Sequence, residues 1–217
     1  MTNLDDSDFS PDAYCALIDA FRLRGYRICG FDDAHPDARD LILRHDVDMT
    51  IEAARDLARL EKQIDVTSTY FILLRSELYN PQTLENAEML TEILSLGHTI
   101  GLHFDAALYP DDAKLLDAAA TRECEILEKL LGREVQAISF HRPRKSLVPY
   151  NGTLAGRLQT YAPKFFSEIG YCSDSRGEWG HGHPLDHSHI ATGKSVQLLT
   201  HPIWWMLSGA TREDKLR

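Results

Sequence analysis

Short apolar segments alternate with longer amphipathic segments along most of the chain. Runs of about four to eight mainly apolar residues are typical of buried strands, whereas apolar residues at every third or fourth position are typical of helices. Predicted strands cover residues 41–45, 66–73, 99–104, 135–140, 170–173 and 196–201. Predicted helices cover residues 51–63, 81–96, 112–131 and about 161–169.

This alternation predicts βα units and a parallel sheet that is either open or closed into a barrel. Pro81 suits a first helical turn, and Gly97 and Gly132 stand where helices are expected to end. We therefore expect an α/β fold in a single domain over residues 1–217. In such folds the ligand site lies at the carboxyl ends of the strands.

Polar residues gather at four of those strand ends. Asp46 and Asp48 close the first strand, and because residues two apart on a strand point the same way, two like charges converge there. Taken alone, such a pair is also typical of a turn or a helix N-cap. Similar polar clusters at 97–105, 138–143 and 198–202 favour one shared site instead.

The composition narrows the class of protein. A length of 217 residues with 43% hydrophobic content allows a sizeable core. No apolar run reaches the length of a membrane span, and the acidic first residues lack the features of a secretory signal, so we expect a cytoplasmic protein. Four scattered cysteines suit a reducing compartment. The net charge of −10 argues against a nucleic-acid partner and leaves the substrate and the oligomeric state open.

Imidazole and carboxylate groups at these strand ends suit a catalytic zinc or a similar divalent ion. Asp48 and His103 are the leading ligand candidates, and the residues alone leave the third ligand open. Asp46 is the candidate base for a metal-bound water, with Arg142 to keep its carboxylate ionised. His201 at the last strand end is the candidate acid for the leaving group.

Other histidines have structural interpretations. His98 follows a helix-ending glycine, and a satisfied structural role is favoured over a ligand role. A stretch rich in histidine, glycine and proline is interpreted as a solvated loop or a lid, because the spacings between its histidines match no closed tetrahedral metal site. Its histidines are His181, His183, His187 and His189.

Two further segments have competing interpretations. Trp204 and Trp205 follow His201 directly, and two interpretations have equal weight. Either one of the two tryptophans walls a sugar-sized pocket, or both pack at the sheet edge. Residues 173–179 either bind sugar hydroxyls or a phosphate through Arg176, or form a loop capped by their own serine and aspartate side chains. The capped loop is slightly favoured.

The ordered motifs at 44–48, 97–105, 139–143 and 198–205 resemble those of the NodB-type polysaccharide deacetylases, carbohydrate esterase family 4. They are most similar to the WbmS-like branch, which is associated with surface-polysaccharide gene clusters. The resemblance covers about residues 40–206. It implies a distorted (β/α) barrel, a divalent metal ion, usually zinc, and hydrolysis of an N-acyl group from a sugar.

The resemblance also implies roles for individual residues. The family's base falls on Asp46, its metal-binding aspartate on Asp48 and its first metal-binding histidine on His103. The arginine that orients the base falls on Arg142, and the general acid falls on His201.

One position departs from the family pattern. The second metal-binding histidine of the family would be residue 107, which is Ala107 here. His141 from the neighbouring strand end is our choice for the third ligand, and Asp105 is the alternative. If neither binds, the site holds metal weakly or has lost catalysis.

We therefore expect a metal-dependent hydrolase that removes an acetyl or formyl group from an amino sugar. The expected substrate is a nucleotide- or lipid-linked precursor of surface polysaccharide. Two alternatives remain. One is a non-catalytic carbohydrate-binding protein on a degenerate deacetylase scaffold, motivated by Ala107. The other is hydrolysis of a small amide other than a sugar, because a fold and a metal site do not determine the substrate.

Overall fold

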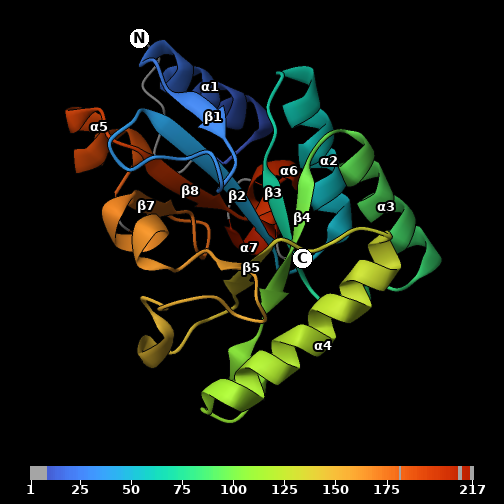
Figure 1. The fold of residues 1–217 in the computed structure, drawn as a ribbon. Helices are drawn as coiled ribbons and strands as arrows, with labels where there is room; N and C mark the ends of the chain where they lie inside the picture. Colours follow the sequence, from blue (N-terminus) through green and yellow to red (C-terminus); the bar gives the residue numbers. More distant parts are fainter. Residues whose placement is uncertain (1–8, 181, 210–211, 216–217) are drawn as a thin grey trace.

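A computed structural model describes residues 9–180, 182–209 and 212–215. At its centre lies one eight-stranded sheet in which every recorded strand pair is parallel (Figure 1). Its strands are β1 (Arg27–Cys29), β2 (Asp40–Val47), β3 (Thr69–Leu73), β4 (Thr99–Phe104), β5 (Ala137–Phe140), β6 (Leu158–Gln159), β7 (Gly170–Ser173) and β8 (Val196–Thr200).

The strand order is β6-β5-β4-β3-β2-β8-β7, with β1 paired to the beginning of β2. No pairing between the outer strands β6 and β7 is recorded in the described part of the chain, so the sheet curls without closing. Since all strands run the same way, their carboxyl ends share one edge. The predicted parallel α/β architecture is confirmed.

Helices connect the strands. In Figure 1, α2 and α3 stand side by side next to β3 and β4, and α4 runs below them. The α-helices are α1 (Pro11–Leu23), α2 (Ile51–Gln63), α3 (Leu84–Ser95), α4 (Ala113–Leu131), α5 (Ser188–Thr192), α6 (Pro202–Met206) and α7 (Arg212–Lys215). Shorter helical segments are η1 (Ala106–Leu108), η2 (Lys145–Leu147), η3 (Lys164–Glu168) and η4 (Pro184–Asp186).

Most predicted elements are present. The helix α1, the strands β1 and β6 and several helical segments of three to five residues were not predicted. The missed α1 begins after the N-cap Ser10 and buries five residues at helical spacing, so its pattern is readable in the sequence. The missed β1 and β6 contain three and two residues, too few for a periodicity to register. The helix predicted over 161–169 shortens to the five-residue π-helix η3.

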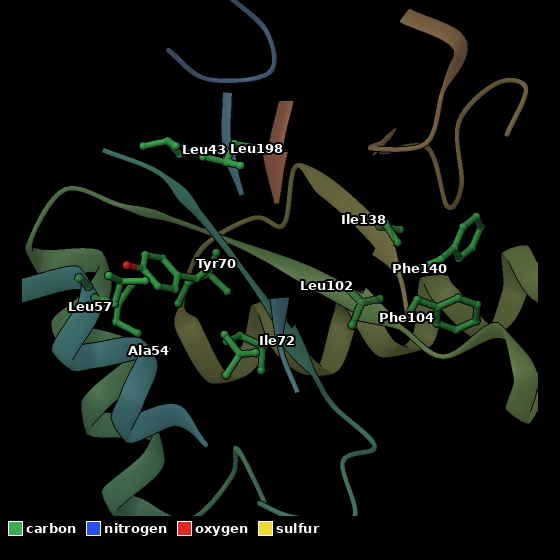
Figure 2. Packing of buried hydrophobic residues seen from close by; sticks show 14 of the residues in the cluster. Leu43, Ala54, Leu57, Tyr70, Ile72, Leu102, Phe104, Ile138, Phe140 and Leu198 are labelled. Atoms are coloured by element: carbon green, nitrogen blue, oxygen red, sulfur yellow. The ribbon is translucent and has the colours of Figure 1, made fainter. Parts of the chain in front are cut away.

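Strand β2 divides the buried interior. All eight of its residues are buried, and they alternate between the helix-covered face and the concave face of the sheet. Leu43 joins the core under the helices, whereas Ile42 packs with Phe71 on the concave side. Figure 2 shows Tyr70 of β3, in the helix-side core, pointing toward Leu57 of α2. Buried side chains on both faces hold β2 rigidly, which suits the strand that carries the candidate site.

A buried carboxylate ties β2 to the helices behind it. Glu61 of α2 is 0% exposed and accepts hydrogen bonds from the hydroxyls of Tyr14, Ser68 and Tyr70 at 2.6 to 2.7 Å. Nε2 of His45 lies 3.0 Å from its Oε1. Burial alone would raise the pKa of Glu61, but His45 and the hydrogen-bond donors outweigh it and lower the pKa to about 2.

Replacing this carboxylate should flatten the acid sensitivity of the fold. Because the pKa of Glu61 falls from 4.5 to about 2 on folding, its stabilisation is present above about pH 4.5 and is lost as the pH falls toward 2. A shift of that size corresponds to about 3 kcal/mol. Urea unfolding between pH 7 and pH 3 should show a shallower loss of stability for Glu61→Gln than for the unchanged protein.

The matched control is Glu52→Gln, which removes an exposed carboxylate from the same helix. It should retain the pH dependence of the unchanged protein. Parallel curves for Glu61→Gln and the unchanged protein would show that Glu61 does not carry the effect.

Candidate active site

Asp46 lies on the concave face of β2 and is paired with Arg44 of the same strand. The guanidinium of Arg44 donates two hydrogen bonds, from Nε to Oδ1 at 2.9 Å and from Nη2 to Oδ2 at 2.7 Å. The side chain of Arg44 is 0% exposed and stacks over the rings of Phe71 and Tyr161. Burial alone would raise the pKa of Asp46, but Arg44 outweighs burial and keeps the pKa below its usual range.

The prediction that Arg142 lies beside Asp46 is wrong. Arg142 directs Nη2 toward Oδ2 of Asp105 at 3.3 Å, and 76% of its side chain is exposed. Arg142 follows β5 and has a φ of +44°. Arg44, two residues before Asp46, takes the expected place because residues i and i+2 of a strand share a face.

Asp48, His103 and His141 converge at the strand ends, as expected for a metal site. Nε2 of His103 and Nδ1 of His141 lie 3.1 and 3.3 Å from Oδ1 of Asp48, and 3.1 Å from each other. Oδ1 of Asp48 is buried and accepts no hydrogen bond of good geometry. Burial would raise the pKa of Asp48, but the two imidazoles hold it well below its usual range.

These distances fit a metal ion. Ligand atoms bound tetrahedrally at about 2.0 to 2.1 Å from zinc lie about 3.3 Å apart. A buried carboxylate oxygen without a donor, facing two ring nitrogens, is the donor set that a divalent ion satisfies. Residues Asp48, His103 and His141 therefore fit the expected ion, and they leave room for a fourth ligand such as water.

Ser139 connects the metal-ligand candidates to Asp46. Nδ1 of His103 lies 2.6 Å from Oγ of Ser139, and that hydroxyl donates to Oδ1 of Asp46 at 3.4 Å. In this arrangement the hydrogen of His103 is on Nδ1, which leaves the lone pair of Nε2 for a metal. Ser139 was not among the predicted site residues, although its place in the third motif, residues 139–143, was a signal.

The register of the sheet explains how His141 reaches the cluster. His103 is paired with Ser139 across β4 and β5, and His141 follows two residues later. Asp105, the alternative ligand, is used elsewhere, because its Oδ1 accepts the Ala107 N–H at 3.0 Å. Ala107 itself lies exposed in η1. Of the two alternatives, the geometry brings His141 to the ligand atoms.

His201 faces the same site from the other side. Its Nδ1 donates to Oδ1 of Asp174 at 2.6 Å, and its Nε2 lies 3.7 Å from Oδ2 of Asp48. Trp205 Nε1 donates to Oδ2 of Asp174 at 2.7 Å, and Asp174 is 0% exposed. Burial would lower the pKa of His201, but Asp174 raises it to about 9. His201 can thus hold a proton at neutral pH and present it through Nε2.

Asp174 was not among the predicted site residues and was expected only as part of the loop 173–179. The available signal was its position directly after the strand β7, which is paired with β8. The capped-loop interpretation of this segment is supported in part, since Ser173 Oγ accepts the N–H of Ser175 at 3.1 Å.

A cleft of about 490 Å³ opens over these groups. Asp46, Asp48, His103, His141 and His201 reach it together, and Arg142 lies at it without touching Asp46. Trp204 lines the cleft, whereas Trp205 packs inside and donates a hydrogen bond to Asp174, which agrees with the interpretation that one of the two tryptophans walls the pocket. The remaining walls are mainly apolar and include Met49, Phe140, Tyr161, Leu199 and Ile203.

The other histidines that the structure describes do not line the cleft. His98 is buried, with Nδ1 accepting the Ser68 N–H and Nε2 near the Ala58 carbonyl, which confirms its structural role. In the histidine-rich stretch, His183 and His187 accept backbone N–H groups at the starts of η4 and α5. His181 lies outside the described residues. Within the described ranges, one cluster of metal-ligand type was found, that of Asp48, His103 and His141.

Similar folds occur among solved structures. The Streptococcus pyogenes deacetylase PplD in complex with acetate shares 15% identity and a TM-score of 0.52, over 95% of this chain and 85% of that chain. The Bc1960 peptidoglycan N-acetylglucosamine deacetylase shares 17% identity and a TM-score of 0.50, over 77% of this chain and 74% of that chain. No family model and no curated protein matches the chain.

At these identities the likeness concerns the fold alone. It confirms the expected distorted (β/α) barrel of the NodB type. The finer similarity to the WbmS-like branch remains a prediction. Across the described residues, no helix has both the length and the apolar character needed to cross a bilayer.

Proposed function

We propose that this chain is a metal-dependent hydrolase that removes an N-acyl group, acetyl or formyl, from an amino sugar. The observation that carries the proposal is the arrangement around one cleft. A candidate metal site stands between a buried carboxylate paired with Arg44 and a histidine paired with Asp174. Amide hydrolysis needs these three groups, which are a water-activating centre, a base and an acid.

Asp48, His103 and His141 would hold the ion, supported by Ser139 behind His103. Once bound, a divalent ion supplies a water molecule of lowered pKa and stabilises negative charge on the amide oxygen. Asp46 accepts the proton of the attacking water, and Arg44 keeps Asp46 ionised between turnovers. Because Oδ2 of Asp46 lies 3.7 Å from Nε2 of His103, the base stands directly beside the proposed metal site.

His201 completes the proposed chemistry by protonating the departing amine. Its Nε2 faces the cleft, and the carboxylate of Asp174 favours the protonated ring. An amine leaves poorly as an anion, so a positioned acid on the far side of the amide is the group the reaction requires. The apolar walls beside these polar groups would contact the acyl group and exclude bulk water.

The proposed biological substrate is a nucleotide- or lipid-linked amino-sugar precursor of a surface polysaccharide. This part of the proposal rests on the motif resemblance of residues 40–206. The competing proposal of a non-catalytic sugar-binding protein was motivated by Ala107. The convergence of His141 on Asp48 and His103 supports the catalytic alternative, because it supplies a candidate for the third ligand without residue 107.

The decisive experiment measures amine release from a panel of N-acetyl and N-formyl amino sugars. Protein loaded with one equivalent of Zn²⁺ should release amine, chelation should abolish the release, and metal addition should restore it. His201→Gln should retain the metal and lose at least about a hundredfold in rate, which excludes a contaminating hydrolase. Metal-loaded protein that binds these sugars without releasing amine from any of them would favour the non-catalytic alternative.

A further inference from the structure

Arg176 occupies an unusual backbone position at the rim of the cleft. It lies in the turn after β7, which closes when the Gly177 N–H donates to the Asp174 carbonyl at 2.9 Å. Arg176 is the third residue of this turn and has a φ of +66°. Glycine or asparagine is favoured at such a position, because a side chain is strained there. The exposed arginine thus stands where the backbone alone would favour a different residue.

Arg142 repeats the pattern at the same cleft. Its φ is +44° although Pro143 follows, and a proline favours extended backbone in the residue before it. Among the described residues, four that are not glycine have a positive φ, and two of these four are arginines lining this cleft. Strained backbone persists where the surroundings impose it, and it concentrates at binding sites. Backbone strain and charge therefore coincide at one rim.

The carboxylates of the cleft have partners that offset their repulsion of a bound anion. Asp46 is paired with Arg44, and Asp174 is paired with His201. Asp48 lies against two imidazoles that would hold the metal with it. The chain as a whole carries a net charge of −10, so attraction of anions is not a general property of its surface. Positive charge at this rim is a local feature.

We propose that Arg176, assisted by Arg142, binds an anionic group of the substrate. This inference rests on the proposed function and narrows it. The acylated amino sugar carries a phosphate ester or a carboxylate within reach of the cleft rim. A guanidinium suits this task because its planar fork donates two parallel hydrogen bonds to such groups. Both arginines line the cleft, and Arg142 also directs Nη2 toward Oδ2 of Asp105 at 3.3 Å.

The test measures binding to metal-free protein, so that neither catalysis nor anion coordination by a metal enters the result. Calorimetric titrations would compare N-acetylglucosamine with N-acetylglucosamine 1-phosphate, N-acetylglucosamine 6-phosphate and N-acetylmuramic acid. We expect at least one anionic sugar to bind about ten- to a hundredfold more tightly than the neutral sugar. The two phosphates and the carboxylate separate the possible sources of the charge.

Arg176→Gln should lower the affinity for the anionic sugar far more than the affinity for the neutral sugar, and so remove most of that preference. The matched control is Arg133→Gln, which removes an exposed arginine that does not line this cleft. Its preference for the anionic sugar should equal that of the unchanged protein. Equal binding of neutral and anionic sugars by the unchanged protein, or equal effects of the two substitutions, would overturn the inference.

The outcome is separable from that of the proposed function. Suppose that the protein releases amine from neutral sugars and binds anionic sugars no more tightly. This result would support the proposed hydrolase activity and refute the proposed anion-binding site. Binding of an anionic sugar that depends on Arg176, without amine release by metal-loaded protein, would support the anion-binding site and refute the hydrolase activity.

Discussion

Asp46→Asn should keep the metal ion and lower the rate of amide hydrolysis by about a hundred- to ten-thousandfold. Asn has nearly the same shape as Asp but cannot accept the proton of an attacking water. The three atoms that would bind the metal belong to Asp48, His103 and His141, so the substitution removes the base without removing a ligand. Metal content by elemental analysis and steady-state rates on the same preparation would measure both effects.

The companion substitution separates the two aspartates. Asp48→Asn should lose the metal, because it removes the charged ligand whose Oδ1 faces both imidazoles. Circular dichroism would check folding, since Asp46→Asn leaves the buried charge of Arg44 without its carboxylate. Similar metal loss in both folded variants would mean that Asp46 is itself a ligand and that another group is the base.

His141→Ala should weaken metal binding by several orders of magnitude. A water-activating site normally has three protein ligands, and Nδ1 of His141 is the third ligand atom within reach of Asp48 and His103. Asp105→Ala should weaken binding by only about ten- to a hundredfold, because Asp105 acts on the site through its contact with Arg142, next to His141. Competition titrations with a chromophoric chelator would give both affinities.

The comparison decides between the two candidates for the ligand that replaces the residue missing at Ala107. A larger loss in Asp105→Ala than in His141→Ala would assign the third ligand to Asp105. His141 would then belong to substrate binding. Equal and small losses in both would mean that Asp48 and His103 bind the metal without a third side chain.

The location of the site was predictable because strand periodicity is local. Asp46 and Asp48 are two residues apart at a strand end, so they share a face whatever the rest of the chain does. Polar residues at the ends of β4, β5 and β8 meet them because all these strands are parallel. The same period places Arg44 on the face that carries Asp46, although Arg142 was the predicted partner of that carboxylate.

The remaining pairings depend on register and on loop conformation, which the sequence pattern does not specify. His141 reaches His103 because β5 pairs with β4 at Ser139, and a register shifted by one residue would turn His141 to the opposite face. Asp174 meets His201 because β7 lies beside β8, although 27 positions separate the two residues along the chain.

The sequence by itself therefore determined the parallel α/β class, the buried strand β2 and the edge of the sheet where polar groups converge. These features depend on hydrophobic periodicity and on strand direction, which neighbouring residues encode. Tertiary structure alone decided that Asp174 orients His201 and that Arg142 turns toward Asp105. Those contacts join residues distant in the chain, or depend on single backbone angles such as the positive φ of Arg142, and no local pattern encodes them.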